Sequence, residues 1–118
     1  MKLGLGQINT KWMDVDNNKE HILKLVKEAK EQHCRAIFFA EMCLTGFSSD
    51  AQRLLDKISY QEALEFFMKA AKDNELYIGF GAVEGSEGSN YNCYTVLSPE
   101  GQVVNKYYKI HSFSPGGE

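Results

Sequence analysis

The apolar residues of the first half of the chain follow two periodicities. From Lys2 to Asn9 they alternate with other residues, and the two glycines in this stretch favour a strand that lies close to another backbone. From Asn18 to Gln32 they recur every three or four residues, as in an amphipathic helix. Asn17, with Glu20 three residues later, is a typical N-cap pair, so the pattern predicts that this helix starts there.

Four further strands and one further helix follow. Ser59 and Glu62 form a second capping pair, ahead of apolar residues at helical spacing. Between the two helices, the stretch from Glu41 to Lys57 is irregular in pattern. The predicted strands are Arg35–Phe39, Leu76–Val83, Tyr91–Leu97 and Gln102–Tyr107, with a polar turn over Glu84–Asn90 and a tight turn over Ser98–Gly101.

This order of elements indicates an α/β fold. Strand–helix–strand units imply parallel crossovers, so the first strands form a parallel sheet with helices packed against it. The 118 residues suit one domain, but the chain stops in a loop-like tail after its last predicted strand. We therefore expect that an α/β domain of this kind continues beyond this ending.

Composition and charge exclude several classes of protein. The net charge is −3, which gives neither the basic surface of a nucleic-acid-binding protein nor a cationic face for a membrane. The apolar runs are shorter than the roughly 20 residues of a membrane-spanning helix. Three cysteines without metal or redox spacing favour a reduced, cytoplasmic protein, and the histidines have no ligand spacing, so we predict no metal site.

Two charged residues follow buried strands. Glu41 lies at the carboxyl end of the strand Arg35–Phe39, and Lys109 follows the last strand. Ligands of open α/β sheets bind at the carboxyl ends of the strands, where both residues are expected. A carboxylate between apolar neighbours is costly to bury unless it is paired, so the residues alone allow either a structural ion pair or a reactive site.

Four segments of the chain together carry a family resemblance. In order they are Leu5–Asn9, Phe39–Phe47, Tyr91–Gly101 and Tyr107–Phe113. They resemble motifs of the nitrilase superfamily of carbon–nitrogen hydrolases. The chain departs from the usual pattern at Ala40, where Pro is common, at Tyr108, where Arg is common, and at Ser112, where Leu is common.

The resemblance implies a fold and a reaction. The fold would be a nitrilase-like layered α-β-β-α sandwich, with residues 1–118 as the N-terminal part of one domain. Glu41 would be the general base, Lys109 the oxyanion stabiliser and Glu118 a second glutamate. The family's cysteine nucleophile lies beyond the lysine, so it would be missing here and this chain alone would be inactive. The implied substrate is a small amide, nitrile or N-carbamoyl compound, with no cofactor, and the implied assembly is a homodimer or higher homo-oligomer.

Three alternatives stay open at this stage. Cys43 lies two residues from Glu41, but a free cysteine is more often a small buried apolar residue than a nucleophile. The chain can also be a non-catalytic assembly or binding module, because an incomplete sheet exposes apolar surface. A nucleotide-binding domain is disfavoured, since the glycines of Gly79–Gly85 do not have dinucleotide-binding spacing and no helix follows them.

Overall fold

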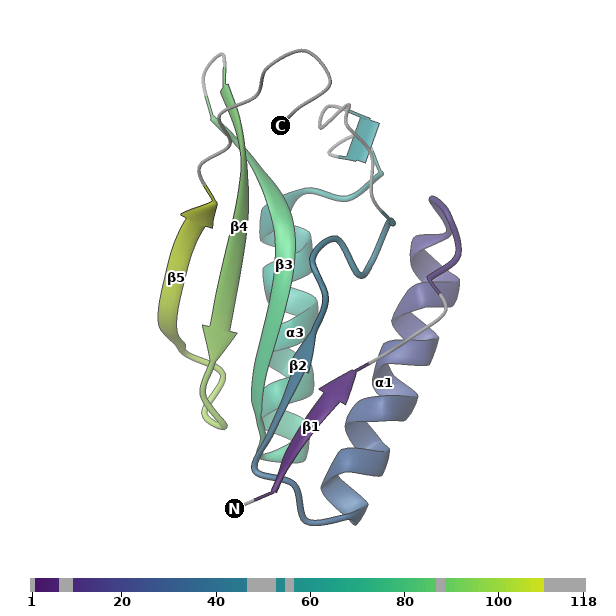
Figure 1. Ribbon diagram of the computed structural model, residues 1–118, viewed down its shortest axis with the longest axis vertical. Helices are drawn as coiled ribbons and strands as arrows, with labels where there is room; N and C mark the ends of the chain where they lie inside the picture. The colour runs from purple at the N-terminus through teal and green to yellow at the C-terminus, as the bar shows by residue number, and fades with distance from the viewer. Residues whose placement is uncertain (1, 7–9, 47–52, 55–56, 87–88, 110–118) are drawn as a thin grey trace.

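The computed structural model of the chain describes residues 2–6, 10–46, 53–54, 57–86 and 89–109. Strands and helices alternate from β1 to β3, and β4 and β5 follow β3 without a helix between them (Figure 1). The elements are β1 (Leu3–Gly6), α1 (Val15–Glu31), β2 (Ala36–Phe39), α3 (Tyr60–Asn74), β3 (Tyr77–Ser86), β4 (Ser89–Leu97) and β5 (Val103–Lys109). Residues 53, 54 and 57 are also helical, although the sequence pattern had predicted an irregular segment there.

The strands of the described residues form one mixed sheet in the order β1-β2-β3-β4-β5. β1, β2 and β3 are parallel neighbours, joined through α1 and α3. β3, β4 and β5 are antiparallel neighbours, joined by hairpin connections. The predicted α/β fold with parallel crossovers is therefore confirmed, as one sheet and one helical layer.

Both helices pack on the same face of the sheet (Figure 1). Phe67 of α3 lies against Phe80 of β3 with ring centroids 4.3 Å apart, and both rings are fully buried. Ile22 and Val26 of α1 complete this core. Among the described residues, neither α1 nor α3 packs on the opposite face. We call it the open face, and Leu5 of β1 exposes 77% of its surface there. Burial of apolar residues against the helical layer therefore supplies the hydrophobic stabilisation of this fold.

The helix starts were predicted with mixed success. The capping box at Ser59 and Glu62 is confirmed, because each side chain accepts a hydrogen bond from the other residue's backbone N–H. The predicted start of the first helix at Asn17 is wrong. Asp14 caps α1 by accepting a hydrogen bond from the Asn17 N–H, so the helix begins three residues earlier.

The hairpin between β3 and β4 is longer than predicted. Glu84–Asn90 was expected to be a polar turn, but β3 continues to Ser86 and β4 begins at Ser89. The extension pairs Glu84 with Tyr91 and Gly85 with Asn90. The last strand is likewise displaced, ending at Lys109 rather than at Tyr107.

Candidate functional site

A tight turn after β2 carries Glu41. The Met42 N–H donates to the Gly81 carbonyl on β3 at 3.0 Å, and the Gly46 N–H donates back to the Met42 carbonyl at 2.8 Å. Met42 has a φ of 56°, a left-handed conformation that costs a non-glycine residue roughly 1 kcal/mol or more. The chain therefore leaves the sheet sharply at Glu41, and the main-chain hydrogen bonds of the turn hold it over β3.

Glycine at position 81 allows this close approach. A Cβ atom added to Gly81 would lie 2.6 Å from the Glu41 Cα, a distance that real Cβ contacts essentially never show. The backbone of Glu41 consequently rests directly on the backbone of β3, on the open face. Any side chain at position 81 would push the Glu41 backbone away from the sheet.

The N-terminus of α1 supports the same turn from its other side. Asn18 is fully buried, and its Nδ2 donates to the carbonyls of Leu44 and Lys11, each at 2.8 Å. The Lys11 N–H donates to the Asn18 Oδ1 at 2.7 Å. The Met13 N–H also donates to the Thr45 carbonyl at 2.8 Å. The Glu41 turn is thus fixed to both β3 and α1.

The sheet register places the backbone of Lys109 on the same face as this turn. Gly81 pairs with Tyr94, and Tyr94 pairs with Tyr107, which is two residues before Lys109 on β5. Alternate residues of a strand share a face, so Lys109 shares the face of Tyr107. Lys109 lies two strands across the sheet and two residues along it from Gly81, which puts the two Cα atoms roughly 12 Å apart. The structure describes the backbone of Lys109 but not its side chain, and Glu118 lies outside the described residues.

Glu41 is exposed in this chain, although its neighbours in the sequence are apolar. A cavity of about 20 Å³ does lie beneath the turn, lined by Met42, Thr45 and Val83 among others. Its volume is roughly that of one water site, so it is too small to hold an amide or nitrile substrate.

The cysteines near the turn are poor nucleophiles. Cys43 is buried with 3% of its surface exposed, and burial raises the pKa of its thiol to about 12. Cys93 is equally buried, and burial raises its pKa to about 11. Both thiols remain protonated near neutral pH, and a thiol reacts through its thiolate. The described residues contain no cluster of three or more side chains suited to a metal ion.

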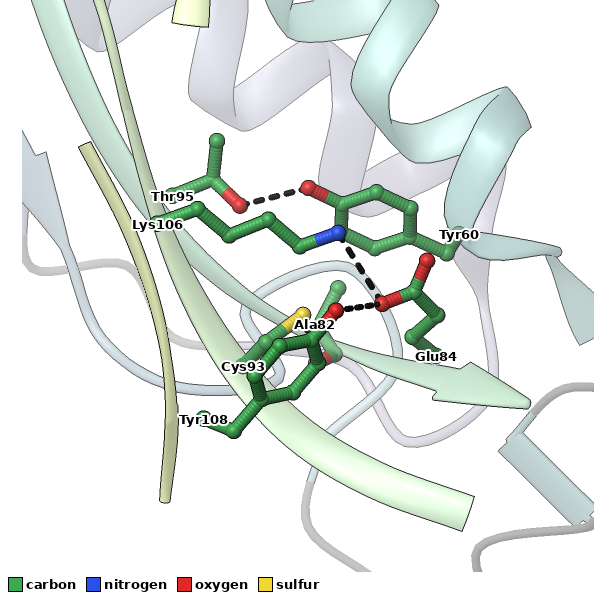
Figure 2. Close-up of polar contacts among 7 residues, drawn as sticks. All are labelled: Tyr60, Ala82, Glu84, Cys93, Thr95, Lys106 and Tyr108. Carbon is green, nitrogen blue, oxygen red and sulfur yellow. Dashed lines mark hydrogen bonds and ion pairs between the residues drawn. The ribbon is translucent and has the colours of Figure 1, made fainter. Parts of the chain in front are cut away.

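A second polar cluster lies on the helix-covered face and was missed by the sequence analysis (Figure 2). The Lys106 ammonium of β5 lies 2.9 Å from the Glu84 carboxylate of β3 and 4.2 Å from the centroid of the Tyr60 ring. Tyr108 donates its hydroxyl to the same Glu84 oxygen at 2.7 Å. The Tyr60 and Thr95 hydroxyls share a hydrogen bond of 2.6 Å. No sequence signal links these residues, because Glu84 and Lys106 are 22 positions apart.

Charge pairing decides the protonation of this cluster. Burial favours the neutral form of Glu84, but the hydrogen bonds from Lys106 and Tyr108 outweigh it and lower the pKa of the carboxyl. Burial likewise opposes the Lys106 charge, but the interactions of Lys106 with Glu84 and Tyr108 outweigh burial and raise the pKa of that ammonium. The cluster is therefore an ion pair that joins β3 to β5. Tyr108, at a position where Arg was expected, contributes a neutral donor to it.

Comparisons with known proteins give one consistent result. The family model for carbon-nitrogen hydrolases matches residues 2–118. A nitrilase from Pyrococcus abyssi is 31% identical over an alignment of 117 residues, and the match covers 96% of this chain and 44% of that protein. The crystal structure of an amidase from Nesterenkonia superposes with a TM-score of 0.84 at 16% identity, over 99% of this chain and 45% of that one. A carbon-nitrogen hydrolase from Helicobacter pylori gives 0.83 at 17% identity, over 99% and 41%. This chain thus spans less than half the length of these relatives.

Proposed function

Because the chain belongs to the carbon-nitrogen hydrolase family, we propose that it supplies the base side of an active site that hydrolyses small amides, nitriles or N-carbamoyl compounds. The observation that carries this proposal is the anchored turn, which holds Glu41 on the same sheet face as the backbone of Lys109. A carboxylate and an ammonium on one face are the groups that acyl transfer from nitrogen requires.

The proposed reaction uses a cysteine thiol as nucleophile. Glu41 accepts the thiol proton while the sulfur attacks the substrate carbon, and the Lys109 ammonium stabilises the negative charge that develops on the substrate. With an amide or N-carbamoyl substrate the C–N bond then breaks, and the leaving ammonia or amine takes the proton from Glu41. With a nitrile, the nitrogen takes that proton to give a thioimidate, and water adds to its carbon before ammonia leaves and the thioester forms. Water, deprotonated by Glu41, hydrolyses the thioester. Glu118 is proposed to hold the Lys109 ammonium in place.

We place the nucleophile outside residues 1–118. In one structure of the Nesterenkonia amidase, acrylamide has added to the active site cysteine of that enzyme. Cys43 and Cys93 do not suit such a role, because burial raises the pKa of each thiol well above neutral pH. We accordingly infer that the 118-residue chain alone has no hydrolytic activity.

A non-catalytic assembly module is the second candidate function. The open face exposes Leu3, Leu5 and Tyr107, each by at least half of its surface. Exposed apolar side chains at both edges of one sheet face favour self-association, so a homodimer or larger homo-oligomer is proposed. The described helices include none that could cross a membrane. Three free cysteines favour a reducing, cytoplasmic environment.

The test is to express the natural reading frame that contains these residues and to measure ammonia release from short amides and nitriles. We expect turnover by the wild type and a loss of about 10²–10⁴-fold in Glu41→Gln, the range for a general base. Residues 1–118 alone should be inactive. Turnover by residues 1–118 that disappears in Cys43→Ser would contradict our placement of the nucleophile. Absence of turnover by the natural frame, with oligomers in light scattering, would favour the assembly module.

A further inference from the structure

Two hydrogen bonds fix the main chain on either side of Glu41. Before it, the Tyr94 hydroxyl of β4 donates to the Phe39 carbonyl at 2.7 Å. After it, the Met42 N–H donates to the Gly81 carbonyl at 3.0 Å. Phe38 is the last residue of β2 that pairs with β3. The Tyr94 hydroxyl therefore donates to the first carbonyl beyond that pairing, which is the carbonyl of Phe39. Glu41 thus lies between one anchor from β4 and one from β3.

The Tyr94 side chain reaches β2 by crossing over β3. A Cβ atom added to Gly79 would lie 2.9 Å from the Tyr94 hydroxyl oxygen and 2.5 Å from the Phe38 ring, so a side chain at position 79 would occupy this path. Gly81, two residues further along the same strand, leaves room for the backbone of Glu41 because it has no side chain. The two glycines therefore open the face of β3 for both the tyrosine and the turn that it anchors.

The protonation state of Tyr94 suits an anchor. The phenol is half-buried, and burial, followed by the nearby Cys43, Tyr107 and Glu41, raises its pKa to about 12. Tyr94 therefore stays neutral at ordinary assay pH and keeps its hydroxyl proton. A phenol has a single O–H to donate, and the Phe39 carbonyl receives it. Tyr94 consequently holds the backbone beside Glu41 without donating a hydrogen bond to the carboxylate.

We propose that Tyr94 is a positioning residue for Glu41: its hydroxyl, passing over Gly79, fixes the point at which the chain leaves β2 and so sets where the general base stands. This inference rests on the proposed function of Glu41. Displacement of a catalytic group by about 1 Å can cost roughly 10²-fold in rate. Loss of the anchor should therefore lower kcat by about 10- to 100-fold and change KM by less than about 3-fold.

The test compares Tyr94→Phe with Tyr107→Phe. Tyr107 is the register partner of Tyr94 on β5, and their rings lie 6.0 Å apart. Each variant removes one hydroxyl from the same face. In the natural reading frame, kcat should fall only in Tyr94→Phe. In the 118-residue chain, amide exchange at Met42 should accelerate at least about 10-fold in Tyr94→Phe relative to Tyr107→Phe, while exchange at Ile78 in β3 reports any global destabilisation.

The outcomes separate this inference from the proposed function. Faster exchange at Met42 with unchanged exchange at Ile78, together with the fall in kcat, supports the positioning role. Unchanged exchange at Met42, or an unchanged kcat despite faster exchange, overturns it. An equal loss of kcat in Tyr107→Phe also overturns it, because the effect would then not be specific to the anchor. If the wild-type natural frame hydrolyses no amide or nitrile, the proposed function fails and the inference falls with it.

Discussion

Replacing Asn18 by alanine should destabilise the chain strongly for so small a change. The side chain is fully buried, and it makes three hydrogen bonds to the backbone of Lys11 and Leu44. Each lost bond costs about 1 kcal/mol, and alanine regains about 0.5 kcal/mol through its higher helix propensity. The net loss in free energy of unfolding is therefore about 2–3 kcal/mol.

Urea unfolding followed by circular dichroism measures this loss. With a typical slope of about 2 kcal/mol per molar urea, the midpoint should fall by about 1 M. Asn17→Ala is the matched control, because Asn17 is in the same helical turn but its Oδ1 has no hydrogen-bond partner among the described residues. The control should lose much less stability than Asn18→Ala. Equal midpoints for the two variants would refute the argument that the buried hydrogen bonds of Asn18 stabilise the fold.

Two further predictions concern other buried polar groups. Lys106→Met keeps the apolar stem but removes the charge that pairs with Glu84, and should lower the free energy of unfolding at pH 7 by about 1–2 kcal/mol. The pKa of Glu84 is lowered in the folded state, so the ion pair is lost as the pH falls below 4.5, the usual pKa of a glutamate. Thermal melts should therefore show that the stability difference between wild type and Lys106→Met shrinks below this pH. A difference that stays constant with pH would contradict the pairing. In the folded chain at pH 8, iodoacetamide should label the half-exposed Cys34 faster than the buried Cys43, and peptide mass spectrometry can measure both rates. Equal labelling rates would contradict the burial of Cys43.

The start of α1 shows why local signals can mislead. Asn17 and Asp14 are both residue types that cap helices well, and three residues separate them. A start at Asp14 puts Asn18 inside the first turn, where its buried side chain bonds to Lys11 and Leu44. The sequence pattern contains both caps, but the choice between them depends on a contact with residue 44, which local pattern does not reveal.

The end of β3 was misjudged for a related reason. A glutamate followed by glycine and serine is typical of a turn, so the strand was expected to stop at Val83. Glu84 instead stays in the strand because Lys106 and Tyr108, on the second strand along, donate to its carboxylate. Such cross-strand pairs can outweigh a weak strand propensity, and they become visible only once the register is known.

The alternation along β3 links the core to the candidate site. Ile78 and Phe80 are fully buried against the helical layer, while Gly79 and Gly81, which alternate with them along the strand, have no side chain on the open face. Glycine inside a strand is a recognised sign of close backbone approach. Applied to Gly79 and Gly81, that rule predicts that another segment lies on this part of the sheet. At Gly81 this neighbour is the turn that carries Glu41, and at Gly79 it is the Tyr94 side chain that anchors the turn. The strand that contributes to the core therefore also provides the surface on which the proposed base is held.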